Sequence, residues 1–245
     1  MSCCPPDAHP YAQPPEGYSP RGVEKTLGSD LKVYVSSPPS SPTAAILVLP
    51  EVFGWSGRLK GICDSFASYG YLAIMPDCHR GDTALGKPDI PKWVAEVDYD
   101  VVGKDLEDIR SYLSSLEITS ISSIGFCWGA WAWAKAASSN FNFKCCIGPH
   151  PSIKLEHFAF NRSIVEMCEK ITCPVLLIPG SNDQDEVKPG GEFAAIFEAK
   201  GGKSVLFEDQ LHGWMSRGDV NDPEIKAGVE KGMELALEFL KEHSP

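Results

Sequence analysis

The residues with the clearest chemical potential lie in I-G-F-C-W-G at positions 124–129. Cys127 stands two residues from Gly125 and two from Gly129, in the pattern G-x-C-x-G. A short apolar run precedes the pattern and an alanine-rich stretch follows it, which predicts a tight turn from a strand into a helix. At such a turn the positive end of the helix dipole favours a thiolate. Cys127 is therefore a candidate nucleophile; the alternative interpretation is a buried structural cysteine.

A nucleophile on such a turn needs a base, and an acid that orients the base, later in the chain. Asp183 follows an apolar run in P-G-S-N-D, and His212 follows a later run in L-H-G-W. We expect the Asp183 carboxylate to hold the His212 imidazole toward the thiol. Asp185 competes with Asp183 for the role of the acid, and Glu186 does so less strongly. Asp183 is preferred because it lies closest to the end of the expected strand.

Another carboxylate, Glu51, follows the apolar run 44–49 in L-P-E-V-F-G. In a fold with this kind of turn, that loop crosses above the nucleophile and supplies an N–H group to the oxyanion hole. Apolar neighbours on both sides of Glu51 favour its protonated form and suit proton exchange with a nearby thiol. We expect Glu51 to face the thiol; the alternative is an ordinary exposed loop acid.

The elements that must position these residues are short apolar runs that alternate with stretches of helical period, as in strands joined by crossover helices. Several runs are apolar throughout, which predicts a mainly parallel sheet buried on both faces by helices. The expected strands are 31–35, 44–49, 72–75, 121–124, 145–148, 175–178 and 204–207. The expected helices are 106–116 and 229–240, with weaker ones at 56–69, 128–138 and 192–200.

The length of 245 residues, with 43% hydrophobic and 22% charged residues, fits one globular α/β domain and excludes a disordered or coiled-coil chain. Residues 1–22 are rich in proline and almost free of aliphatic side chains, so we expect an extended arm there. The single domain then spans residues 23–245. The stretch 79–91, broken by glycine and proline, predicts a long loop over one end of the sheet.

A net charge of -11 argues against partners such as nucleic acid or an anionic membrane. Nine cysteines, an odd number in a chain long enough to fold without disulfides, predict a reducing compartment and hence a cytoplasmic location. We expect no signal peptide and no spanning helix. We also expect no cofactor and no metal, because no cysteine or histidine spacing fits a zinc site and the Cys3-Cys4 pair forms neither a metal nor a lipidation motif.

Taken together, the motifs P-E-V-F-G-W, G-F-C-W-G, G-S-N-D and L-H-G-W resemble those of the dienelactone hydrolase (carboxymethylenebutenolidase) family in the α/β-hydrolase superfamily. The resemblance extends from about Arg21 to the C-terminus. It implies that Cys127, His212 and Asp183 form a catalytic triad and that Glu51 helps to hold and release the thiol proton. It also implies an oxyanion hole made by the backbone N–H groups of Val52 and Trp128. Arg80 and Arg217 would then be clamps for a substrate carboxylate. Two tryptophans within the motifs, Trp55 and Trp214, are further candidates for substrate binding.

The resemblance implies an α/β-hydrolase fold and an enzyme of the carboxylic ester hydrolase class (EC 3.1.1). We expect it to open a small-molecule ester or lactone through a thioester on Cys127, as a monomer or homodimer. Two alternatives stay open. One is a catalytically silent α/β-hydrolase-fold protein that binds a ligand or partner. The other is a thiol redox sensor, in which Cys127 is oxidised and Cys78, Cys145 or Cys146 then resolves it by forming a disulfide.

Overall fold

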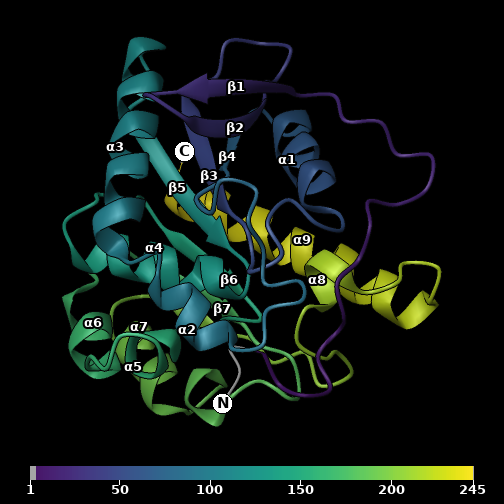
Figure 1. The fold of residues 1–245 in the computed structure, drawn as a ribbon, viewed down its shortest axis with the longest axis vertical. Coiled ribbons are helices and arrows are strands. Elements are labelled where there is room, and N and C mark those ends of the chain that lie inside the picture. The colour runs from purple at the N-terminus through teal and green to yellow at the C-terminus, as the bar shows by residue number, and fades with distance from the viewer. Residues whose placement is uncertain (1–3, 245) are drawn as a thin grey trace.

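A computed structural model describes residues 4–244, so Cys3 lies outside the described residues. An eight-stranded sheet in the order β1-β2-β4-β3-β5-β6-β7-β8 runs through the protein (Figure 1). The pairings from β4 to β8 are parallel, whereas β2 pairs antiparallel with both β1 and β4. The strands are β1 (Val23–Leu27), β2 (Leu31–Ser36), β3 (Ala44–Leu49), β4 (Leu72–Pro76), β5 (Ser120–Gly125), β6 (Cys146–Pro149), β7 (Val175–Ile178) and β8 (Lys203–Ser204).

Helices cover both faces of the sheet, as the apolar strands require. Side chains along β3 alternate between two core clusters: Leu47 packs with the helices of one face, and Val48 packs with those of the other. The first face carries α2 (Ile90–Ala95), α3 (Tyr99–Ser115), α4 (Trp128–Ser138), α5 (Leu155–Phe158), α6 (Ile164–Lys170) and α7 (Glu192–Glu198); the second carries α1 (Leu59–Ser68), α8 (Trp214–Arg217) and α9 (Pro223–His243). A short 3-10 turn, η1 (Asp185–Val187), precedes α7. Within residues 4–244 no helix has both the length and the apolar character needed to cross a membrane.

The expected α/β-hydrolase fold class is confirmed, and two edges of the sheet differ from the expected strands. The edge strand β1 escaped prediction because its sequence, VEKTL, is largely exposed and lacks an apolar run. At the other edge, β8 ends at Ser204, and Phe207 joins the sheet only through an isolated bridge with Gly180. Both differences lie at solvent-facing edges, where burial imposes little pattern on the sequence.

Residues 4–22 form no helix or strand and run along the surface past α8 and α1 to β1, in purple in Figure 1. The second half of this arm is fastened to a buried carboxylate, Asp64 of α1. The Tyr18 hydroxyl and the backbone N–H of Arg21 donate to Asp64 Oδ2. The Tyr34 and Ser36 hydroxyls donate to Asp64 Oδ1 at 2.8 and 2.7 Å. One carboxylate therefore joins the arm, β2 and α1.

We expect Asp64→Ala to lower the free energy of unfolding by about 2–4 kcal/mol, because it leaves several buried donors without an acceptor. Urea unfolding measures the loss. The control is Asp209→Ala, an exposed aspartate that should change the midpoint little. An Asp64→Ala midpoint equal to that of the control would contradict the anchoring role.

Candidate active site

Cys127 lies at the turn between β5 and α4, with φ at 51° and ψ at -110°. A positive φ is unfavourable for a residue with a side chain, so the surrounding packing must impose it. A Cβ on Gly125 would lie 2.2 Å from the carbonyl oxygen of Gly129, and a Cβ on Gly129 would lie 2.2 Å from that of Leu49. Both glycines are thus needed for close packing, which is the physical basis of the G-x-C-x-G pattern.

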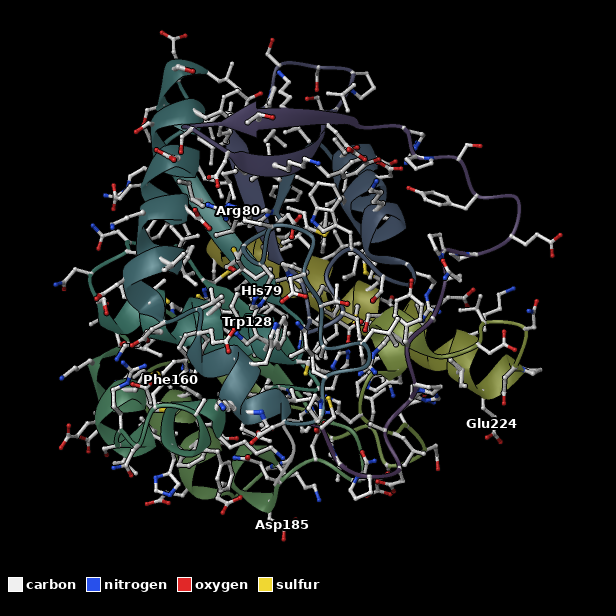
Figure 2. The ribbon with its side chains drawn as sticks, in the orientation of Figure 1. His79, Arg80, Trp128, Phe160, Asp185 and Glu224 are labelled. Atoms are coloured by element: carbon white, nitrogen blue, oxygen red, sulfur yellow. The ribbon has the colours of Figure 1, made fainter. Side chains whose placement is uncertain are left out.

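His212 and Asp183 lie side by side in loops at the carboxyl end of the sheet. Nδ1 of His212 is 2.6 Å from Oδ1 of Asp183, and both side chains are buried. The other carboxylate oxygen accepts a hydrogen bond from the Gly180 N–H at 2.7 Å, which fixes its orientation. The competing acid, Asp185, is 94% exposed, contacts Lys188 and points away from the protein (Figure 2). The geometry therefore pairs the imidazole with the acid nearer the strand end.

The environment of His212 favours its charged form. A ring nitrogen of His212 lies within 4.8 Å of the sulfur of Cys127. Burial opposes a charged imidazole, but the Asp183 carboxylate and the Cys127 thiolate outweigh it and raise the pKa of His212 to about 9. At neutral pH His212 can therefore be an imidazolium, and its positive charge favours the thiolate form of Cys127, the reactive state of a cysteine nucleophile.

Glu51 lies in the loop after β3, and its side chain is fully buried. Its Oε2 is 2.6 Å from Nε of Arg217, and its Oε1 accepts a hydrogen bond from the Ser56 hydroxyl at 3.3 Å. Burial raises the pKa of Glu51, and the Arg217 guanidinium opposes that shift. Arg217 also lies over the ring of Phe53 at 5.0 Å. Glu51 is thus part of a buried ion pair beside the thiol.

The profile of the dienelactone hydrolase family matches residues 31–244. The chain belongs to this family. A carboxymethylenebutenolidase homolog from Xenopus tropicalis is 24% identical over 240 residues, and the alignment covers 92% of each chain.

Solved structures share the α/β-hydrolase fold of this dienelactone hydrolase family member. A carboxyl esterase from Bacillus coagulans aligns with a TM-score of 0.66 at 13% identity, over 92% of this chain and 99% of that one. A dienelactone hydrolase-like promiscuous phosphotriesterase from metagenomic libraries aligns with a TM-score of 0.62 at 16% identity, over 92% of this chain and 98% of that one. At these identities the likeness concerns the fold, and the chemistry must be argued from the residues.

The structure brings together Cys127, His212, Asp183, Glu51 and Arg217, but it gives the other candidates for substrate binding different surroundings. Arg80 forms two 2.8 Å contacts with the carboxylate of Asp105 and one of 3.1 Å with Asp30. A substrate carboxylate would have to displace these partners.

Both candidate tryptophans have contacts that hold them in place. The indole N–H of Trp55 donates to the Pro76 carbonyl at 3.1 Å. Trp214 is fully buried in the core and stacks on Phe207, with 4.8 Å between the ring centroids. The oxyanion hole of Val52 and Trp128 stays a prediction: Val52 follows Glu51 in the loop after β3, and Trp128 is the first residue of α4.

Three residues near the thiol were not among the predicted site residues. Ser152 Oγ lies 3.4 Å from Cys127 Sγ, and the ring of His150 lies 5.0 Å from that of His212. Burial lowers the pKa of His150 well below its usual value, so this histidine stays neutral. The only sequence signal for His150 and Ser152 is their position just after β6. The third residue, Cys4, lies 3.5 Å from Cys127 and comes from the arm, which carries no periodic pattern that could have placed it.

Proposed function

We propose that this protein hydrolyses a small carboxylic ester or lactone, with Cys127 as nucleophile, His212 as acid and base, and Asp183 as the orienting acid. The observation that carries the proposal is the strained Cys127 at the start of α4, within reach of an imidazole whose other side is held by a buried carboxylate. Family membership supports the reaction class. We place the enzyme in the cytoplasm because of its cysteine content, and leave monomer and homodimer as alternatives.

In the first half-reaction the Cys127 thiolate attacks the carbonyl carbon of the substrate. The carbonyl oxygen takes up the negative charge, and the backbone N–H groups of Val52 and Trp128 are our candidates to stabilise it. When the tetrahedral intermediate collapses, the C–O bond to the leaving group breaks and the His212 imidazolium gives its proton to the departing alkoxide. The products are an alcohol and a thioester on Cys127; a lactone would keep both parts in one molecule.

In the second half-reaction the neutral His212 takes a proton from water, and the resulting hydroxide attacks the thioester carbonyl. The C–S bond then breaks, Cys127 leaves as a thiolate and the imidazolium is restored. The Asp183 carboxylate stabilises the imidazolium in both halves without itself becoming protonated.

The experiment that tests this function is a panel of p-nitrophenyl esters, alkyl esters and lactones assayed with the wild-type protein and with Cys127→Ala. We expect turnover of at least one class by the wild type and none above background by the variant. Binding of such compounds without turnover would favour the catalytically silent alternative.

The charge of His212 predicts an alkaline limit to activity that depends on the leaving group. Above pH 9 the imidazole loses the proton that an alkoxide must receive, so kcat/KM for an alkyl ester should fall about tenfold per pH unit. A p-nitrophenolate leaving group needs no proton and serves as the matched control, which should show no such fall. A descending limb near pH 6.5, or the same limb for both esters, would contradict the elevated pKa of His212.

Glu51→Gln should raise the reactivity of the Cys127 thiol toward alkylation and lower the turnover of substrate. The substitution removes a negative charge near the thiolate and leaves the positive Arg217 without its carboxylate, so iodoacetamide should inactivate the free enzyme faster, most clearly below neutral pH. Turnover should fall, because we propose that Glu51 helps to hold the thiol proton in the free enzyme and to release it before the thiolate attacks. The control is Glu208→Gln, an exposed glutamate. An unchanged pH profile of inactivation together with unchanged turnover would show that Glu51 has no part in the chemistry.

A further inference from the structure

The N-terminal arm brings a second sulfur to the candidate nucleophile. Cys4 Sγ lies 3.5 Å from Cys127 Sγ, although 123 positions separate the two residues. Cys127 is fully buried and Cys4 is half-buried above it. The two sulfurs would need to approach by only about 1.5 Å to reach the length of a disulfide bond.

Hydrogen bonds seat this part of the arm on the loops that carry the triad. The backbone N–H of His9 donates to the His212 carbonyl at 2.8 Å, and Arg217 donates to the His9 carbonyl. The Asn182 amide donates to Asp7 at 2.8 Å and accepts from the His212 N–H at 2.6 Å. The position of Cys4 is therefore coupled to the residues that surround the imidazole.

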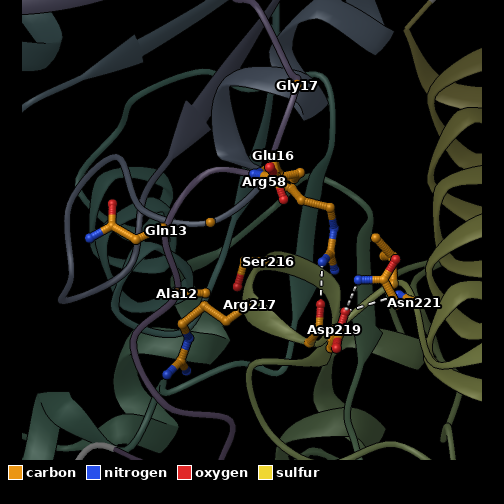
Figure 3. Close-up of a pocket in the computed structure, with 13 residues that line it drawn as sticks. Ala12, Gln13, Glu16, Gly17, Arg58, Ser216, Arg217, Asp219 and Asn221 are labelled. Carbon is orange, nitrogen blue, oxygen red and sulfur yellow. Dashed lines mark hydrogen bonds between the residues drawn. The ribbon is translucent and has the colours of Figure 1, made fainter.

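Farther along, the arm spans a hollow. A cavity of about 630 Å³ is lined by Ala12, Gln13 and Glu16 of the arm and by Arg58 and residues 216–221 (Figure 3). In the structure the first residues of the arm cover the site, and both Cys127 and His212 are buried, so entry of a substrate requires these residues to move away.

We propose that Cys4 is the resolving thiol in a reversible Cys4–Cys127 disulfide, which forms when a hydroperoxide oxidises the nucleophile and which locks the arm over the site. The Cys127 thiolate attacks the O–O bond, forms a sulfenic acid and releases hydroxide or an alkoxide. The Cys4 thiol then attacks the Cys127 sulfur; the S–S bond forms, the S–O bond breaks and water leaves. A dithiol reductant restores both thiols.

The position of Cys4 distinguishes it from the resolving cysteines expected from the sequence. Cys145 contacts the Ser122 hydroxyl, Cys146 contacts Cys173 at 3.8 Å, and burial raises the pKa of Cys78 well above its usual value. Cys4 is in direct contact with Cys127. The imidazolium of His212 also favours the Cys127 thiolate, the form that a peroxide oxidises.

Loss of activity on oxidation rests on the proposed role of Cys127 as nucleophile, whereas formation of the disulfide does not. The two are measured separately. Cleavage after lysine and arginine yields peptide 111–135, which contains Cys127 and no other cysteine, and peptide 1–21, which contains Cys3 and Cys4. Mass spectrometry of the crosslinked peptides therefore reports the bond even if no ester is hydrolysed.

The experiment treats wild type, Cys4→Ser and two controls, Cys3→Ser and Cys173→Ser, with hydrogen peroxide, in parallel with and without a metal chelator. The wild type should lose about 2 Da, crosslink peptides 1–21 and 111–135, lose esterase activity and regain it fully with dithiothreitol. Both controls should behave like the wild type. Cys4→Ser should form no crosslink, gain about 32 Da on peptide 111–135 and stay inactive after reduction.

Three results would overturn the proposal. One is a wild type without the crosslink, and another is a Cys4→Ser variant that recovers as fully as the wild type. The third is loss of activity that the chelator prevents: the sulfurs of Cys4 and Cys127 and a ring nitrogen of His212 lie within 4.8 Å of one another, so this result would point to a metal that bridges them. A crosslink in a protein without esterase activity would refute the proposed function and leave the disulfide standing.

Discussion

Replacing Cys127 with alanine is expected to lower kcat/KM for a small ester by about 10⁴-fold or more, because no other group can form the covalent intermediate. The residual rate would come from the oxyanion hole and substrate binding alone. The fold should persist, since close packing at this turn depends on Gly125 and Gly129, which the substitution leaves in place.

The matched control is Cys173→Ser, which removes a half-buried sulfur in contact with Cys146 and should leave turnover unchanged. In the reduced wild type, one equivalent of iodoacetamide should label Cys127 ahead of the other eight cysteines and abolish activity. Activity that survives complete alkylation of Cys127 would rule it out as the nucleophile.

His212→Ala and Asp183→Asn are expected to lower turnover by about 10³- to 10⁴-fold or more while leaving the fold intact. Without the imidazole, neither the leaving group nor the attacking water exchanges its proton. Without the carboxylate, the imidazole loses the partner that raises its pKa and fixes its ring. Circular dichroism and thermal unfolding of each variant would separate a catalytic loss from a folding defect.

The matched control for Asp183→Asn is Asp185→Asn, because the two carboxylates lie two positions apart and only one contacts His212. We expect the Asp185 variant to keep essentially full activity. Combining His212→Ala with Cys127→Ala should add almost no further loss, since triad members act as a unit. The reverse ranking of the two aspartate variants would reassign the orienting acid.

The centre of the site was predictable because local patterns encode it. A G-x-C-x-G turn is required by backbone packing within a few residues, and the positions of Asp183 and His212 follow from the ends of neighbouring strands. Most strands of the sheet are apolar runs, and burial on both faces makes them recognisable. The parallel topology brings the carboxyl ends of these strands, and the site residues that follow them, to the same edge of the sheet.

Contacts between distant segments were not predictable from one sequence. Nothing in the sequence around Arg217 shows that it pairs with Glu51, or that Arg80 is held by Asp105. The arm is the clearest case: proline fixes its extended form, but its place over Cys127 and His212 depends on hydrogen bonds with loops about 200 positions away, such as that from His9 to His212. Such pairings depend on the tertiary structure and leave no periodic trace in the sequence.

The most direct test of the account is the mass of the enzyme quenched in acid during the first turnovers of p-nitrophenyl acetate. Catalysis through Cys127 predicts a gain of about 42 Da on peptide 111–135, which contains Cys127, and its rapid removal by neutral hydroxylamine, as expected for a thioester. The neighbouring hydroxyl of Ser152 falls in a separate peptide, 145–154. An acetyl group on that peptide, stable to hydroxylamine, or steady hydrolysis with no covalent intermediate in wild type and Cys127→Ala alike, would contradict catalysis by Cys127.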